Sequence, residues 1–118
     1  HRDGPGEILN TYINQQLRVT ELLLEQAGNQ GCDIVTTSED ITGLSDYLVD
    51  ITETNIFPEL VRKSAPLAES RLSEIARKYS MYVIGCYYKQ KGTKIYNTAS
   101  IFGRDGKVCG EYGKIHLP

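Results

Sequence analysis

Residues 81–88 read MYVIGCYY, and this apolar run decides the fold. Successive side chains along a strand point to opposite faces, and here the residues of both faces are apolar. Strands of this kind are covered on both sides, as in layered α/β proteins. Two further strands are predicted at residues 95–102 and 108–117, and Asp105-Gly106 between them is a strong hairpin signal. The three runs therefore predict a sheet that ends in an antiparallel hairpin.

Two helices are predicted before these strands. The first runs from Ile8 to Ala27 and is closed by Gly28, and the second has Pro66 in its first turn. A strand over residues 32–38 lies between the helices. The order α-β-α-β-β-β predicts an α/β fold with two helices packed on a mixed sheet. We expect the first helix to turn inward a stripe that consists of Leu9, Tyr12, Ile13, Gln16, Thr20, Leu23, Leu24 and Ala27.

Composition narrows the classes of function. The 118 residues carry 13 basic and 15 acidic side chains, a net charge of −2, so neither nucleic acid nor an anionic membrane is an expected partner. No apolar run reaches membrane-spanning length. The three cysteines, Cys32, Cys86 and Cys109, are widely spaced and form no Cys-x-x-Cys pair. This pattern argues against disulfides and a zinc site and favours a reducing, cytoplasmic setting. The sequence implies no metal or organic cofactor.

Residues 40–56 form a long polar connection after the first strand. Long loops at this place often carry binding residues, although an ordinary surface loop is an equally good interpretation.

Lys114 stands out because it lies in an otherwise apolar strand beside Tyr112 and Ile115. Burying an ammonium is costly unless a counter-charge accompanies it, and Glu39, at the end of the first strand, is the partner that the sequence favours. A lysine beside a carboxylate can stabilise an oxyanion while the carboxylate acts as a general base. The pair could instead be a structural salt bridge, or Lys114 could reach solvent by its long stem.

Two runs, LSEIARKYSMYVIGCYY at 72–88 and IYNTASIFGRDGKVCGEYGKIHLP at 95–118, resemble the carbon–nitrogen hydrolase (nitrilase) superfamily. The resemblance extends over nearly the whole chain from Ile8 onward. It implies an α-β-β-α sandwich, of which this chain supplies one part, and a Glu-Lys-Cys triad that cleaves a nitrile or amide C–N bond. By this resemblance Glu39 is the general base, and Lys114 stabilises the tetrahedral intermediate.

The chain departs from the family pattern at three places. Ser38 stands where proline usually precedes the glutamate, and Gly113 stands where arginine often precedes the lysine. The nucleophilic cysteine of the family lies in its second half. Cys109 is five residues from Lys114 and is expected on the opposite face of the strand, and Cys86 is expected to be a small core residue. We therefore expect no complete triad within these residues.

Residues 1–118 are accordingly expected to be the N-terminal part of a single hydrolase domain that ends before its cysteine nucleophile, so that this part alone is inactive. The intact protein is expected to take a small nitrile or amide substrate and, by resemblance, to form a homo-oligomer. The alternative is a non-catalytic α/β interaction module on the same scaffold.

Overall fold

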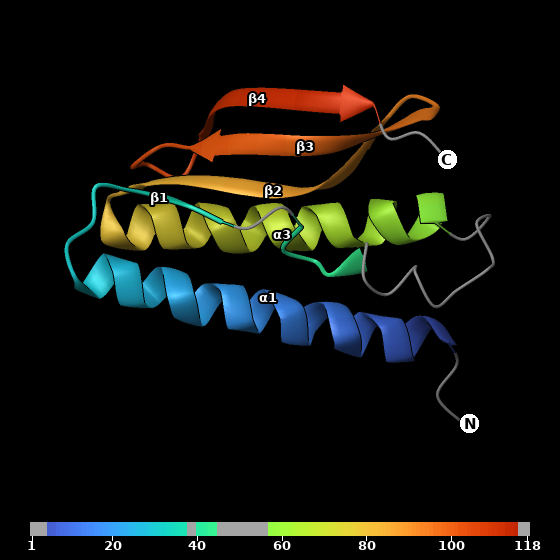
Figure 1. The fold of residues 1–118 in the computed structure, drawn as a ribbon, viewed down its shortest axis with the longest axis horizontal. Coiled ribbons are helices and arrows are strands. Elements are labelled where there is room, and N and C mark those ends of the chain that lie inside the picture. Colours follow the sequence, from blue (N-terminus) through green and yellow to red (C-terminus); the bar gives the residue numbers. More distant parts are fainter. Residues whose placement is uncertain (1–4, 38–39, 45–56, 116–118) are drawn as a thin grey trace.

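The computed structural model describes residues 5–37, 40–44 and 57–115. Helix α1 spans Pro5–Asn29 and helix α3 spans Phe57–Tyr79. The strands are β1 (Ile34–Thr36), β2 (Tyr82–Lys91), β3 (Lys94–Phe102) and β4 (Val108–Ile115). The order of these elements confirms the predicted α/β class, with two helices on a mixed sheet (Figure 1).

The described strands form one sheet in the order β1-β2-β3-β4. β1 runs parallel to β2, whereas β2, β3 and β4 are antiparallel neighbours. The β3–β4 pairing contains an irregularity, because Ile101 pairs with Gly110 while the next residue, Phe102, pairs with Val108. The extra residue on β4 is a β-bulge, which bends and twists the strand locally.

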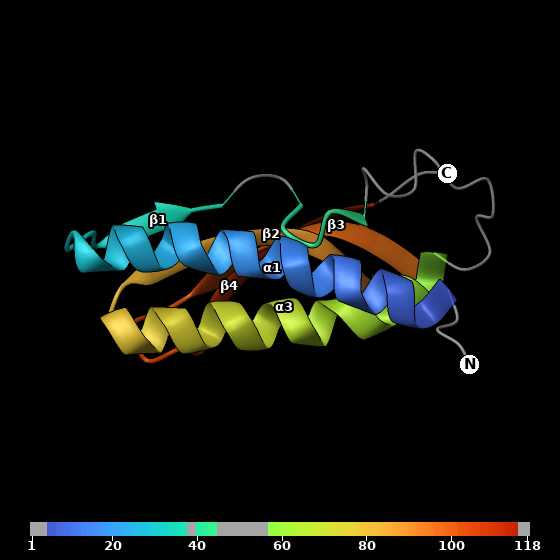
Figure 2. The same ribbon diagram turned by 90° about the horizontal axis from the view of Figure 1, so that it is seen from below.

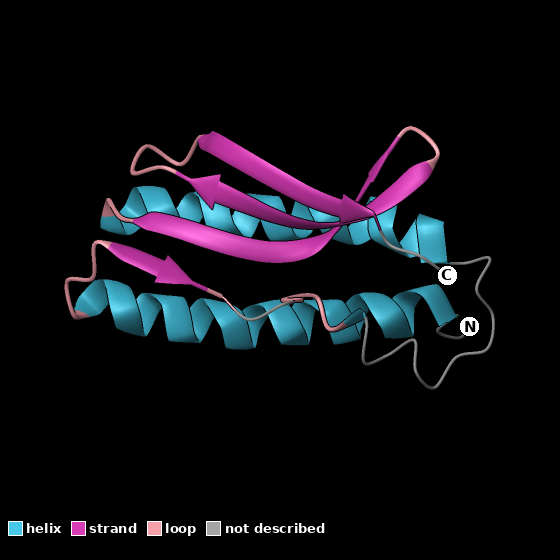
Figure 3. Cartoon of the chain, turned by 45° about the horizontal axis from the view of Figure 1, so that its top comes forward, coloured by secondary structure: helices cyan, strands magenta, loops and turns pink. Residues whose placement is uncertain are grey.

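Both helices lie on the same side of the sheet (Figures 2 and 3). α3 packs directly on β2, and α1 lies beside α3. Buried side chains of α1, α3, β2 and β3 form the core between these layers; they include Leu17, Leu72, Val83, Tyr87 and Phe102. Neither α1 nor α3 is apolar enough over a sufficient length to cross a bilayer.

The inward stripe of α1 differs from the prediction at two positions. Ile13 and Leu24 are buried as expected, but Leu17, which the predicted stripe omitted, is also buried, and Leu23, which it included, is 62% exposed. The prediction assigned Leu23 to the inward face because Leu22, Leu23 and Leu24 are consecutive. Hydrophobic periodicity alone does not say which of the three faces the core.

Helix ends also differ from the prediction. α1 continues past Gly28, and the residue with positive φ is Gly31; the Cys32 N–H bonds to the Ala27 carbonyl at 3.2 Å, and the Gly31 N–H to the Gly28 carbonyl at 3.0 Å. These two bonds form a Schellman motif.

α3 begins nine residues before Pro66, which lies inside the helix rather than in its first turn. The missing N–H costs about 3 kcal/mol, and buried apolar neighbours on either side offset this cost.

Gly28 has a packing role instead of a capping role. A Cβ at this position would lie 2.4 Å from Cγ of the Tyr79 ring, so the absent side chain is what lets α1 approach the end of α3. The Gly28→Ala variant should therefore be less stable by about 1–3 kcal/mol, although alanine favours helix over glycine by about 1 kcal/mol. Chemical denaturation measures the change.

The matched test of this explanation is the Tyr79→Ala background, in which the ring and its Cγ are gone. There Gly28→Ala should be neutral or stabilising. An equal loss of stability in both backgrounds would show that contact with the ring is not the cause.

Candidate active site

Lys114 lies on β4, exposed, on the face of the sheet opposite the helices. Its strand neighbour Glu111 reaches residues on the helix side, and three steps along a strand lead to the opposite face. Lys114 pairs in register with Asn97 of β3, which in turn pairs with Tyr88 of β2. The three residues form one row across β2, β3 and β4.

Glu39 lies outside the described residues, but the chain on both sides of it is described. The Thr37 N–H donates to the Ile84 carbonyl at 2.9 Å, and the Thr37 hydroxyl accepts from the Cys86 N–H at 3.1 Å. On the other side, the Ile41 N–H donates to the Cys86 carbonyl at 3.0 Å. Both flanks of the predicted base are thus anchored to β2 around Cys86.

These anchors lie near the row that contains Lys114. Cys86 is two residues from Tyr88 on β2 and faces the same side. Neighbouring strands lie about 4.8 Å apart, and three such spacings separate β1 from β4. A residue beside β2 on the β1 side and Lys114 on β4 are therefore about 14 Å apart across the sheet. A contact between the side chains of Glu39 and Lys114 stays a prediction, because Glu39 lies outside the described residues.

The beginning of the connection after β1 is not a surface loop. Ile41, Thr42 and Leu44 are buried. Asp40 accepts hydrogen bonds from the Thr42 N–H at 3.1 Å and from its hydroxyl at 2.6 Å, and the Tyr12 hydroxyl of α1 donates to the Gly43 carbonyl at 3.1 Å. This turn joins α1 to the segment after Glu39. The remainder of the connection, residues 45–56, lies outside the described part.

None of the three cysteines lies beside Lys114. Cys109 is exposed near the bulge of β4, and Cys32 is exposed after α1. Cys86 differs from the expectation of a core residue, because it is only partly buried and lies on the face away from the helices. Within the described residues, no three His, Cys, Asp or Glu side chains are grouped as metal ligands would be.

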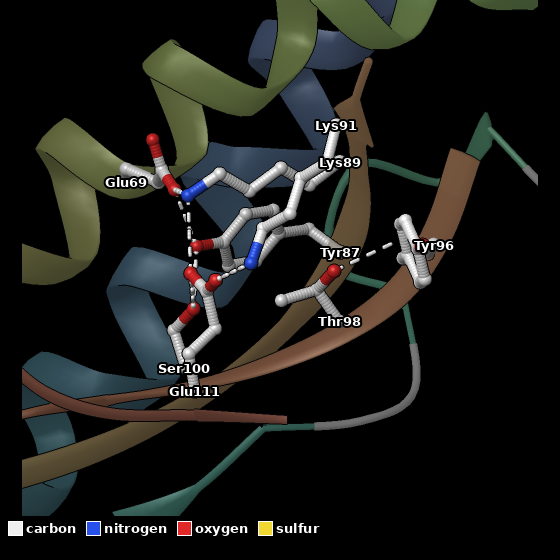
Figure 4. A network of polar contacts seen from close by, with 8 residues as sticks. All are labelled: Glu69, Tyr87, Lys89, Lys91, Tyr96, Thr98, Ser100 and Glu111. Atoms are coloured by element: carbon white, nitrogen blue, oxygen red, sulfur yellow. Dashed lines mark hydrogen bonds and ion pairs between the residues drawn. The ribbon is translucent and has the colours of Figure 1, made fainter. Parts of the chain in front are cut away.

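The sequence did not predict a charged network that lies on the helix side of the sheet. The Lys89 ammonium lies 2.8 Å from the Glu69 carboxylate of α3 and 3.0 Å from the Glu111 carboxylate of β4. Lys91 adds a second contact to Glu111 at 2.5 Å. Figure 4 shows these four side chains gathered around one point between helix and sheet.

Two hydroxyl groups extend the network toward the core. The Tyr87 hydroxyl donates to Glu69 at 2.7 Å and lies 2.7 Å from the Ser100 hydroxyl, which itself lies 3.2 Å from Glu111 (Figure 4). Tyr87 and Ser100 are fully buried. The network therefore connects α3, β2, β3 and β4. One signal in the sequence was the spacing of Tyr87, Lys89 and Lys91, which puts three polar groups on one strand face.

The network shifts the pKa values of its members. Contacts from Lys91, and then from Lys89, lower the pKa of Glu111 to about 2, although partial burial opposes the shift. Burial disfavours the charge of Lys89, but its hydrogen bonds to Glu69 and Glu111 outweigh that effect and raise its pKa. Burial, aided by the nearby carboxylates, raises the pKa of Tyr87 well above its usual range. Lys89 and Glu111 are therefore both charged at neutral pH.

Comparisons with known proteins agree with one another. The family model described as carbon-nitrogen hydrolase matches residues 7–118. The chain is 36% identical over 96 residues to the omega-amidase NIT2 of Bos taurus, and 35% identical over 95 residues to that of Homo sapiens. Each match covers 80% of this chain and 32% of the relative, so the chain spans about a third of the length of these curated relatives.

Solved structures show the same fold. A carbon-nitrogen hydrolase from Helicobacter pylori G27 matches with a TM-score of 0.73 at 22% identity, over 89% of this chain and 36% of that one. The C. elegans NITFHIT protein matches with a TM-score of 0.72 at 21% identity, over 89% and 25%. An amidase from Nesterenkonia sp. matches with a TM-score of 0.67 at 21% identity, over 89% and 38%.

The shift in the pKa of Glu111 predicts how stability depends on pH. Because the folded-state pKa is about 2 and the ordinary value is 4.5, the carboxylate stabilises the fold above pH 4.5, and this contribution is lost as the pH falls toward 2. Glu111→Gln should lower the free energy of unfolding by about 1–2 kcal/mol at neutral pH, a value reduced by the screening of partly exposed pairs. Urea unfolding of both proteins across this pH range measures the difference, which should shrink below pH 4.5.

Glu59→Gln is the matched control. Glu59 pairs with Lys63 at 3.7 Å, but both side chains are more than half exposed, so this variant should change stability by less than about 0.5 kcal/mol. A difference between Glu111→Gln and wild type that stays constant down to pH 2 would refute the assigned role of the carboxylate.

Proposed function

The chain belongs to the carbon-nitrogen hydrolase family, and from this premise we propose that it contributes two residues of an amidase active site, Glu39 and Lys114. Glu39 is the general base, and Lys114 stabilises the oxyanion. The nucleophile is a cysteine outside residues 1–118, so residues 1–118 form the first part of one hydrolase domain and are inactive without the remainder.

The observation that carries the proposal is the position of Lys114. It lies on a sheet face that α1 and α3 leave uncovered, in one row with Asn97 and Tyr88. The segments flanking Glu39 are anchored two residues away from Tyr88 along β2. Lys114 thus lies exposed on a face to which a substrate and a cysteine from another segment have access, and the described flanks of Glu39 are bound to the same strand β2 that contains Tyr88.

The chemistry follows from these roles. Glu39 removes the proton of the cysteine thiol, and the thiolate attacks the amide carbon. The carbonyl oxygen becomes an oxyanion, and the ammonium of Lys114 stabilises that charge. The intermediate collapses as the nitrogen leaves with the proton held by Glu39, and a thioester remains. Glu39 then activates a water molecule that hydrolyses the thioester and releases the acid.

An amide is the favoured substrate class, and a nitrile is the alternative. The two mammalian relatives are named omega-amidases, and a structure of the Nesterenkonia amidase contains acrylamide added at its active site cysteine. We therefore propose a small molecule with a terminal carboxamide as substrate. Assembly into a homo-oligomer and a cytoplasmic location belong to the same proposal.

Activity should depend on Lys114. In the protein encoded by the complete reading frame, Lys114→Met should lower kcat for ammonia release from a terminal amide at least about a hundredfold, because the oxyanion loses its charged partner. Glu39→Gln should have a loss of similar size, because the thiol loses its base. Circular dichroism should show an unchanged fold in both variants.

Lys107→Met is the matched control, since Lys107 is an exposed lysine before the same strand, and its turnover should equal that of wild type. Near-normal turnover by Lys114→Met would remove Lys114 from the mechanism.

The alternative, a non-catalytic interaction module, draws on the same uncovered face. Ile34, Tyr82 and Tyr112 are exposed large side chains on it, which is the kind of surface that another chain covers. Absence of ammonia release from amides and of nitrile hydrolysis by the full-length protein would favour this reading over the enzyme.

A further inference from the structure

We propose that Glu111 is the positioning residue for Lys114: its ion pairs with Lys89 and Lys91 fix the register of β4, and the register decides from which face Lys114 projects. The part that concerns activity rests on the proposed function of Lys114, whereas the part that concerns register does not. Glu111 acts from the helix side of the sheet, and Lys114 lies three residues later on the other side.

The turn before β4 is fixed, because the Ser73 hydroxyl of α3 donates to the Gly106 carbonyl at 2.6 Å, but the irregularity in the ladder separates this turn from the rest of β4. Among the described strands β4 lies at the edge of the sheet and pairs with β3 alone. Its ladder already contains one irregularity, at Val108–Gly110, and Gly110 and Gly113 give it two positions without side chains. Strands rich in glycine have a weakly specified register, and a slip of one residue turns every side chain to the opposite face.

The apolar residues of β4 do little to specify that register. Tyr112 on one face is 72% exposed, and Ile115 on the other is 46% exposed. Register is strongly specified where one face of a strand is apolar and buried. β4 has no such face, because neither alternate set of its side chains enters the core.

Glu111 is the residue that makes the two faces of β4 different from each other. In the observed register it lies opposite Ser100 and accepts hydrogen bonds from Ser100, Lys89 and Lys91. Its side chain is only 20% exposed, in contrast to the apolar residues of the same strand. A slip of one residue would turn the carboxylate to the uncovered face and separate it from both lysines. The same slip would carry Lys114 to the helix side.

The lysines are themselves held in place. Lys89 is fixed to α3 through Glu69 at 2.8 Å, and Glu69 also accepts from the buried Tyr87 hydroxyl. The position that Glu111 must occupy is therefore defined by the rigid helix and the central strand β2. Charge-assisted hydrogen bonds of this geometry are about twice as strong as neutral ones, which suits them to specify one register among several.

Disulfide mapping tests the register directly. In the full-length protein, cysteines introduced by Asn97→Cys and Lys114→Cys lie opposite each other in the observed register and should cross-link on mild oxidation. Cysteines introduced by Asn97→Cys and Ile115→Cys lie on opposite faces and should cross-link poorly. Mass spectrometry of the digested protein identifies the linked positions and separates them from the natural cysteines.

Glu111→Gln should shift this pattern. The yield of the link between positions 97 and 114 should fall about tenfold, and the yield between positions 97 and 115 should rise. A fall in both yields would show general destabilisation and would overturn the proposal, whereas a rise between 97 and 115 is specific to a change of register. Glu59→Gln in the same backgrounds should leave both yields unchanged. Unchanged yields in Glu111→Gln would overturn the proposal.

Kinetic measurements on variants without the introduced cysteines test the consequence for activity. Glu111→Gln should lower kcat about tenfold with KM within about twofold of wild type, because the fraction of molecules with Lys114 in place falls. Glu111→Asp, which keeps the charge, should restore part of kcat. A changed cross-linking pattern with normal kcat would show that Glu111 sets the register but does not position Lys114 for catalysis. Full activity of Lys114→Met would instead refute the proposed function itself.

Discussion

The ammonium of Lys89, shared between the carboxylates of Glu69 and Glu111, joins the helix layer to the middle of the edge strand β4. Apolar packing connects α3 to β2 and β3, but it does not extend to β4, whose large apolar side chains are exposed. The charged network bridges this gap. Its cost of desolvation is limited because each charge has an opposite partner and the buried hydroxyls of Tyr87 and Ser100 are hydrogen-bonded within it.

The sheet thus has two faces with different tasks. The face toward α3 contains the core and the charged network, and it fixes the position of each strand. The face away from the helices contains Lys114 and Asn97, and both flanks of Glu39 are anchored beside it.

Much of the fold follows from local patterns in the sequence. The run at 81–88 and the Asp105-Gly106 turn correctly indicated β2, β3 and β4, and the spacing of apolar residues indicated both helices. Leu23, Pro66 and Gly28 were misjudged because their roles depend on contacts between elements: an adjacent leucine faces the core, buried neighbours carry the helix through Pro66, and the Tyr79 ring requires a glycine beside it. The network was missed for the same reason, since Glu69, Lys89 and Glu111 are distant in sequence. Lys114 was assigned from resemblance, and its role remains a prediction.

The carboxyl ¹³C chemical shift of Glu111, followed against pH in the wild-type protein, measures the central interaction most directly. We predict a titration midpoint near 2, because the two lysines stabilise the ionised carboxylate. A midpoint at the ordinary value of 4.5 would show that Lys89 and Lys91 do not hold this side chain, and the anchoring of β4 would then require another explanation.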